Sequence, residues 1–163
     1  MPHKIALETP ASPVPAQIGL PVRLVIPFIH VNAAVEPLGL TSDGAMDTPK
    51  GPDDVAWYKL GPRPGDTGSA VVAGHFGWAK GVPAVFDNLH KLRVGDTIIT
   101  QDIGGQLITF VVKKIRNYGQ NEIATDVFQS TDGKSHLNLI TCEGWSNTTN
   151  SYTQRLVVFA DKR

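Results

Sequence analysis

Cysteine is nearly absent from this chain, since Cys142 is the only one among 163 residues. A single cysteine cannot form an intramolecular disulfide. At the end of an apolar run, such a residue is more often a small core side chain than a nucleophile. It becomes a candidate nucleophile only where a histidine and a third group stand near it in space.

The chain also has no excess charge and no long apolar run. Fifteen Lys and Arg balance fifteen Asp and Glu, and no stretch gathers several basic residues, so a nucleic-acid partner is not expected. No apolar run reaches the roughly 18 residues that suggest a membrane-spanning helix. Residues 1–8 lack the order of a signal peptide, in which charged residues precede an apolar stretch.

Metal-binding patterns are missing as well. The five histidines lack metal-ligand spacing, a single cysteine cannot build a cysteine-based zinc site, and the acidic residues form no calcium loop. We therefore expect neither a metal nor a cofactor.

Glycine, proline and short apolar runs are what the chain does contain. Hydrophobic residues make up 41%, which suits one core, and 16 Gly and 12 Pro fall between the apolar runs. Four prolines within residues 9–21 favour an extended arm, placed over residues 1–21 and followed by one domain over residues 22–163. The expected strands are 23–26, 28–31, 68–75, 97–100, 106–115, 136–141 and 156–160, and residues 35–40 are expected to form a short strand or a turn. Short helical turns are expected near 53–58 and 85–92, and residues 122–129 are expected to form either a short helix or a long loop.

Seven or eight short strands without regular strand–helix alternation predict a mainly β fold, an antiparallel or mixed β-barrel. Three residues stand at the ends of these strands. His75 ends the strand containing Ala73-Gly74-His75, Cys142 ends the strand containing Ile140-Thr141-Cys142, and Arg155 opens the last strand.

This order of Gly-His, Thr-Cys and Arg resembles the signature of the sortase family. Further residues fit the same pattern over roughly residues 22–162: Trp57-Tyr58, Gly61-Pro62, Pro64-Gly65, Phe86, Leu89, Gly95-Asp96 and Val157-Val158-Phe159-Ala160. The Trp-Tyr and Gly-Pro-x-Pro-Gly stretches look most like class F sortases, with classes E and D as near neighbours. The resemblance implies a single-domain sortase-type β-barrel in which His75, Cys142 and Arg155 are catalytic.

The chemistry explains why these residue types are needed. A thiol with a pKa near 8.5 is only a few per cent thiolate at pH 7, so the nucleophile needs a cationic neighbour. A guanidinium can donate two hydrogen bonds to substrate carbonyls without titrating, and an imidazolium can protonate a leaving amine. The resemblance assigns these tasks to Arg155 and His75, with thiolate–imidazolium as the active minor form. As a hypothesis, the backbone N–H of Glu143 completes the oxyanion site.

Substrate and location also follow from the resemblance. It implies cleavage of an LPxTG-like sorting signal through a Cys142 thioester and transfer to an amine of a peptidoglycan precursor or a pilin. Ala73, Ile140, Thr141 and the segment 117–129 are expected to line the substrate site. The parent protein is expected to be membrane-anchored on the extracytoplasmic face of a Gram-positive bacterium, with the anchor outside this sequence.

Two other readings remain open at this point. One is a different Cys-His acyl transferase or peptidase, for example an L,D-transpeptidase acting on peptidoglycan, although its cysteine motif is not found. The other is a catalytically silent surface module of the same shape, against which the intact Cys142, His75 and Arg155 argue.

Overall fold

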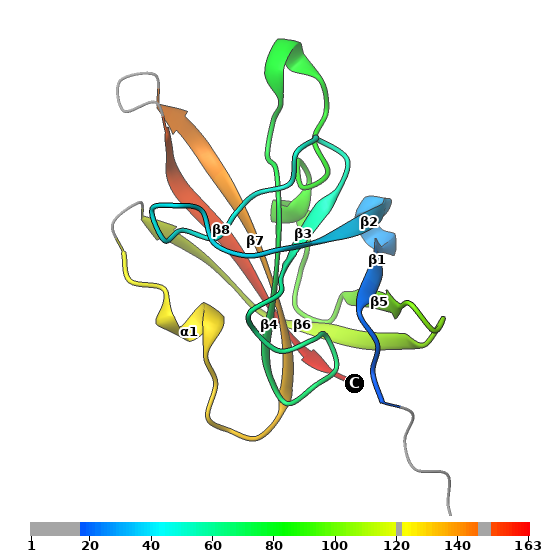
Figure 1. The fold of residues 1–163 in the computed structure, drawn as a ribbon. Coiled ribbons are helices and arrows are strands. Elements are labelled where there is room, and N and C mark those ends of the chain that lie inside the picture. The colour runs from blue at the N-terminus through cyan, green and yellow to red at the C-terminus, as the bar shows by residue number, and fades with distance from the viewer. Residues whose placement is uncertain (1–16, 120–121, 147–150) are drawn as a thin grey trace, which may run out of the picture.

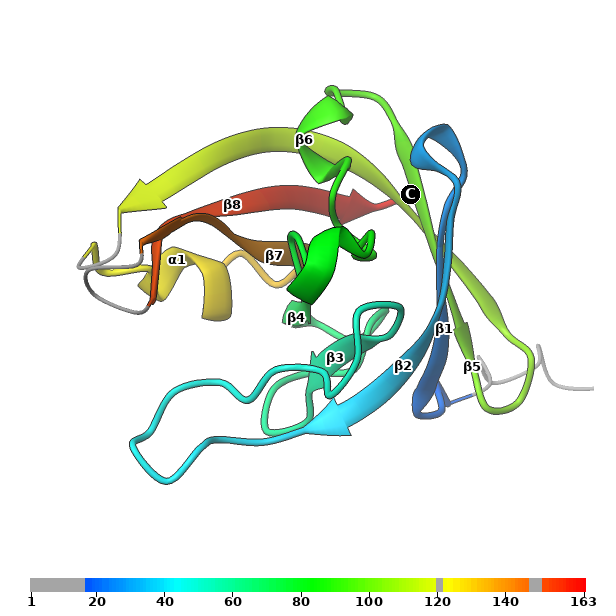
Figure 2. The same ribbon diagram turned by 90° about the horizontal axis from the view of Figure 1, so that it is seen from above.

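The strands close into one barrel. A computed structural model of the chain describes residues 17–119, 122–146 and 151–163, but not the side chains within 142–146 and 151–153. Its eight strands follow the order β1-β2-β3-β4-β7-β8-β6-β5 around the closed barrel, with only a few short helices (Figures 1 and 2). The prediction of a mainly β barrel of seven or eight strands with a few short helices is confirmed.

The strands are β1 Pro21–Ile26, β2 Val31–Leu38, β3 Val55–Tyr58, β4 Gly68–Gly74, β5 Thr97–Asp102, β6 Leu107–Gly119, β7 Ser135–Ser146 and β8 Ser151–Lys162. The short helices are η1 Pro27–Ile29, η2 Ala79–Gly81, η3 Leu89–Lys91 and the α-helix α1 Thr125–Phe128.

Two strand pairs are parallel, β2 with β3 and β4 with β7, and the remaining pairs are antiparallel. The β4–β7 register runs from Gly68 opposite Ser135 to Gly74 opposite Thr141. Because these two strands are parallel, their C-terminal ends meet at the same end of the barrel. That end receives the residues that follow Gly74 and Thr141.

Strand β4 reads as a continuous apolar run because both of its faces are covered. Ala70 and Val72 belong to the main core inside the barrel. Val71, between them, belongs to a second apolar cluster with Tyr118, Val127, Ile140 and Val157. Helix α1 packs against β4 and supplies Val127 to this second cluster. Alternation toward two buried faces therefore leaves almost no polar position on this strand.

Two local predictions are wrong. Residues 28–31 do not form a strand, because Pro27 opens the turn η1 and His30 adopts a left-handed conformation with φ 55°, so that β2 begins only at Val31. Residues 53–58 do not form a helical turn. Val55–Tyr58 is strand β3, and Val55, Ala56 and Trp57 are buried between β2 and β4, so sheet packing decides the local structure there.

Several predicted strands are longer in the structure. β6 continues from residue 115 to Gly119, and β7 and β8 extend well past 141 and before 156. Most of the predicted arm, residues 1–16, lies outside the described residues. Pro21 is already the first residue of β1, a position that proline tolerates. The Gly19 N–H donates to Asp102 Oδ2 at 2.8 Å, which fixes the approach to β1.

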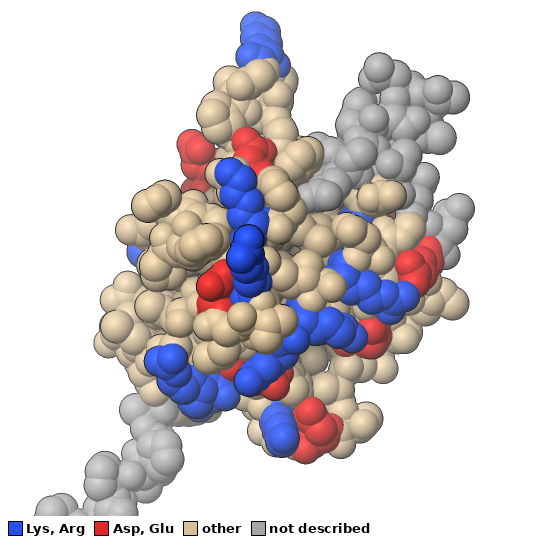
Figure 3. Space-filling view, turned by 180° about the vertical axis from the view of Figure 1, so that it is seen from behind, with Lys and Arg blue, Asp and Glu red and all other residues tan. Residues whose placement is uncertain are grey.

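The described surface carries mixed charge. On the face opposite that of Figure 1, Lys and Arg side chains are interspersed with Asp and Glu (Figure 3). Among the described residues, no helix is long and apolar enough to cross a membrane.

Candidate active site

His75 directly follows the last residue of β4, and close packing fixes this position. A Cβ on Gly74 would lie 2.6 Å from Cδ2 of Phe86, whose side chain is fully buried. The Phe86 N–H also donates to the carbonyl oxygen of His75 at 3.0 Å. The glycine in the Gly-His motif is therefore required by the phenyl ring that packs over the strand end.

The backbone register brings the three predicted catalytic residues to neighbouring strands. His75 and Cys142 each follow one member of the last β4–β7 pair, Gly74 and Thr141. Cys142 is in turn the direct partner of Arg155 in the antiparallel β7–β8 pair. The Cys142 side chain lies outside the description, so its position rests on the backbone.

Two groups surround the His75 imidazole. Nε2 lies 2.6 Å from the carbonyl oxygen of Pro49, in the segment between β2 and β3. A carbonyl only accepts, so Nε2 carries the proton in this contact. The Trp78 ring packs edge-on against the imidazole, with ring centroids 4.9 Å apart.

Trp78 is presented by a loop that is fastened at its base. Both ends of this loop donate backbone N–H groups to the Asp87 carboxylate, Gly77 at 2.7 Å and Ala84 at 2.9 Å. The segment after β4, bright green at the top of Figure 1, projects beyond the strands. The carboxylate thus holds the loop that carries the aromatic neighbour of His75.

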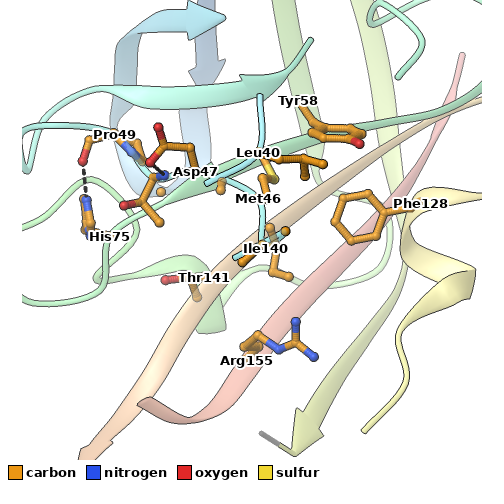
Figure 4. Close-up of a pocket in the computed structure, with 15 residues that line it drawn as sticks. Leu40, Met46, Asp47, Pro49, Tyr58, His75, Phe128, Ile140, Thr141 and Arg155 are labelled. Carbon is orange, nitrogen blue, oxygen red and sulfur yellow. Dashed lines mark hydrogen bonds between the residues drawn. The ribbon is translucent and has the colours of Figure 1, made fainter. Parts of the chain in front are cut away.

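A pocket of about 620 Å³ opens between these elements. It is lined by Leu40, Gly44, Ala45, Met46, Asp47, Thr48, Pro49, Tyr58, Ala73, Gly74, His75, Phe128, Ile140, Thr141 and Arg155. Figure 4 shows His75 and Pro49 on one side of the pocket and Tyr58 and Phe128 on the other, with Thr141 and Arg155 nearer the strand ends.

The far side of the pocket is apolar. Tyr58 and Phe128 pack edge to face, with centroids 5.5 Å apart and an interplanar angle of 80°. Leu40 and Met46 join them from a small hairpin closed by the Leu40–Met46 bridge. This end is suited to a large apolar side chain of a ligand.

The side near the strand ends carries unused polar groups. Among the described residues, the hydroxyl of Thr141 and Nε of Arg155 are buried and have no hydrogen-bond partner. Arg155 Nη2 donates to the main-chain carbonyl of Glu122 over a long 3.3 Å. Buried polar groups are normally paired, so the Thr141 hydroxyl and Arg155 Nε leave hydrogen-bonding capacity unused in two residues that line the pocket.

The residues predicted to bind substrate fall on this pocket. Ala73, Ile140 and Thr141 all line it, and the segment 117–129 contributes Phe128. Glu143 pairs with Gln154 in β7–β8, but its side chain is outside the description, and its role stays a prediction.

Two parts of the site were missed from sequence. One is the wall formed by residues 40–49, including the Pro49 carbonyl. It was missed because a main-chain contact from a distant loop cannot be recognised from the types of the residues. The other is Tyr58, which was placed in a helical turn. Its position beside Trp57 in the Trp-Tyr stretch was the only available signal.

Asn138, on β7, connects α1 to the barrel. Its Nδ2 donates to the carbonyl oxygen of Val127 at 2.6 Å. The neighbouring Phe128 lines the pocket, so this buried amide helps to set the pocket wall.

Within the described part of the chain, no group of three or more His, Cys, Asp or Glu is arranged to hold a metal ion.

Comparisons with known proteins agree with this geometry. The family model for the sortase domain matches residues 24–163. Sortase C-1 from Actinomyces oris is 27% identical, with a TM-score of 0.67 over 86% of this chain and 72% of that one. No curated protein sequence matches the chain.

Two further solved structures share the fold. A Clostridium perfringens sortase D5 transpeptidase is 22% identical, with a TM-score of 0.65 over 89% of this chain and 79% of that one. Sortase A from Corynebacterium diphtheriae is 24% identical, with a TM-score of 0.68 over 91% of this chain and 63% of that one. These matches carry three class names and do not assign a class. Because the sortase-domain model covers nearly all of the barrel, the chain belongs to the sortase family.

Proposed function

We propose that this chain is an active transpeptidase that cleaves an LPxTG-like sorting signal through a thioester on Cys142 and passes the acyl group to an amine. The observation that carries the proposal is the arrangement at the strand ends. His75 directly follows β4, and Cys142 and Arg155 lie on the neighbouring strands β7 and β8, beside a pocket with one apolar side and unpaired polar groups.

The first step is attack of the Cys142 thiolate on the carbonyl carbon of the signal's threonine. The negative charge that develops on the oxygen is stabilised by the Arg155 guanidinium, with the backbone N–H of Glu143 as a second donor. A preorganised donor of this kind lowers the activation free energy by about 3 kcal/mol. His75, as the imidazolium, protonates the leaving amine while the C–N bond breaks, which leaves the thioester.

The second step reverses these roles. An incoming primary amine attacks the thioester carbonyl, neutral His75 takes a proton from the attacking nitrogen, and the Cys142 thiolate leaves. Water in place of the amine gives hydrolysis. Peptidoglycan precursors and pilin lysines are the proposed amines, at the Gram-positive cell surface with which the sortase family is associated.

The apolar side of the pocket is proposed to receive the leucine of the signal. Ala73, Ile140 and Thr141 would then contact the peptide between this side and Cys142. The class F resemblance remains part of the proposal. The two motif stretches behind it lie in contact, since Trp57 Nε1 donates to the carbonyl oxygen of Pro62 at 2.9 Å.

Mass spectrometry tests the proposal directly. The protein and its Cys142→Ala variant are incubated with LPxTG-type peptides and an amine acceptor. The expected result is peptide cleavage and a peptide-sized adduct on Cys142, both absent from the variant. Normal alkylation of the thiol without any adduct would instead favour another Cys-His acyl-transfer reaction, and an unreactive thiol would favour a silent module.

A further inference from the structure

Four side chains outside the pocket form a connected group beside Arg155. We call this group the brace: Arg116 and Tyr118 at the end of β6, and Glu122 and Asp126 in the segment that follows. The Arg116 guanidinium binds a carboxylate oxygen of Glu122 through Nη2 and lies 3.7 Å from Asp126 Oδ2 through Nη1. It therefore connects two acidic residues with two different nitrogens.

Tyr118 joins the brace to the barrel. Its side chain is fully buried, and its hydroxyl donates to Asp126 Oδ2 at 2.7 Å. The Arg116 guanidinium lies over the Tyr118 ring, 4.2 Å from its centroid. Burial, together with the hydrogen bond to Asp126, raises the pKa of the Tyr118 phenol above its usual value, so the hydroxyl stays a donor at neutral pH.

The brace also adjoins two of the proposed catalytic residues, Arg155 and Cys142. Tyr118 is the direct β6–β8 partner of Arg155, which is the β7–β8 partner of Cys142. Both carboxylate oxygens of Glu122 are bound: Oε1 by the Arg116 guanidinium, and Oε2 by the Gly119 N–H at 3.1 Å. Its main-chain carbonyl is the acceptor for Arg155 Nη2.

We propose that the brace positions the Arg155 guanidinium, with Arg116 as the positioning residue that fixes the Glu122 carbonyl. This assignment rests on the proposed function for its consequence in catalysis. A single exposed ion pair contributes little, and the side chains of Arg116 and Glu122 are 45% and 38% exposed. Their combined effect is to restrict where a segment lies, more than to stabilise the fold.

The geometry explains why arginine stands at this position. Its planar fork presents separate N–H groups to Glu122 and Asp126 while its face covers Tyr118. Lysine offers one compact charge and cannot make these three contacts together. Lys114 is the matched control, because it also lies on β6, is exposed, and covers an aromatic ring, Phe159, at 4.5 Å, but within the described residues forms no hydrogen bond or ion pair with the brace.

The first experiment follows the Arg155 Nε–H signal by NMR in the wild-type protein, Arg116→Ala, Arg116→Lys and Lys114→Ala. The proposal predicts a shifted or broadened Arg155 signal in Arg116→Ala, a smaller change in Arg116→Lys and none in Lys114→Ala. Melting temperatures should stay within about 3 °C of wild type for all variants. An unchanged Arg155 signal in Arg116→Ala would overturn the proposal, and this readout needs no enzymatic activity.

The second experiment measures formation of the Cys142 adduct with a signal peptide. We expect Arg116→Ala to lower the acylation kcat about 3- to 10-fold with little change in KM. In an Arg155→Ala background, the same substitution should have no further effect on the rate. An undiminished effect there would show that Arg116 acts by another route, for example through the pocket wall at Phe128. Absence of an adduct in the wild type would reject the proposed function but leave the NMR result to decide the positioning.

Discussion

Nε2 of His75 and the carbonyl oxygen of Pro49 lie 2.6 Å apart, although the residues are 26 positions apart in the sequence. Cysteine–histidine enzymes commonly orient the imidazole with an Asp or Asn side chain. Here a main-chain carbonyl occupies that position, and it comes from a segment that also lines the pocket. The orientation of the imidazole and the shape of the pocket wall are therefore linked.

This contact predicts where the His75 proton resides. Because the carbonyl only accepts, Nε2 should be protonated in the neutral and in the charged imidazole, and proton exchange with Cys142 and the leaving amine should use Nδ1. Nitrogen-15 NMR should show a slowly exchanging N–H on Nε2 of His75. The exposed His90 should give no such signal, and an Nδ1–H tautomer as the main neutral form of His75 would contradict the prediction.

Gly74→Ala should damage both the fold and the site. The added methyl group would lie 2.6 Å from the buried Phe86 ring, and overpacking of this kind costs about 1–3 kcal/mol. Displacement of the adjacent His75 should lower kcat/KM about 10- to 100-fold. Denaturant unfolding and peptide cleavage measure the two effects.

Gly51→Ala is the matched control for this substitution. A Cβ on Gly51 meets nothing within 4 Å, and its backbone is not in the left-handed region. Stability and kcat/KM should therefore stay close to wild type. Equal losses in the two variants would show that the packing of Phe86 on Gly74 does not matter.

The outcome at particular residues shows what sequence can predict. The strand ending at His75 was predicted because a run of small and β-branched residues between breaker loops has few other structures available. The barrel was predicted from seven or eight short strands without regular strand–helix alternation, and the family resemblance supplied the order of the proposed catalytic residues. Strand β3 was missed, because two aspartates before Val55 favour a helix cap and only pairing with β2 and β4 overrides this local signal.

The Pro49 contact and the brace could not be predicted for a different reason. Both depend on which loops fold back over the barrel end, and the contacts with His75 and Arg155 are made by main-chain carbonyls. Every residue carries such a carbonyl, so no pattern of side chains distinguishes Pro49 or Glu122 beforehand.

Phe128→Ala should weaken recognition of the apolar residue of the signal. The phenyl ring packs edge to face on Tyr58 and forms part of the apolar wall, so its removal should lower kcat/KM for a leucine-containing peptide about 10-fold. The same variant should cleave a peptide with alanine in place of that leucine at nearly the wild-type rate. An equal loss with both peptides would place the leucine elsewhere.

His136 lies away from the active site and should stabilise the protein over a restricted range of pH. It stands at the start of β7, with Nδ1 at 2.7 Å from Asp161 and Nε2 at 2.7 Å from Asp132. Burial, the largest single influence, acts to lower its pKa, but the hydrogen bonds to Asp161 and Asp132 raise the pKa of His136 above its ordinary value. The pKa of Asp132 lies below its usual range, mainly because the Lys134 N–H donates to its carboxylate and also because His136 hydrogen-bonds to it.

The signs of these shifts define the range. A raised histidine pKa gives stability that is complete below about pH 6.5 and is lost as the pH rises through the folded pKa. A lowered aspartate pKa gives stability that is present above about pH 4 and is lost on further acidification. His136→Gln should therefore cost most near pH 5.5, about 1–2 kcal/mol, and progressively less above pH 7. Urea unfolding at a series of pH values measures this, and a cost that does not change between pH 5.5 and pH 9 would show that the two carboxylates do not bind the charged imidazole.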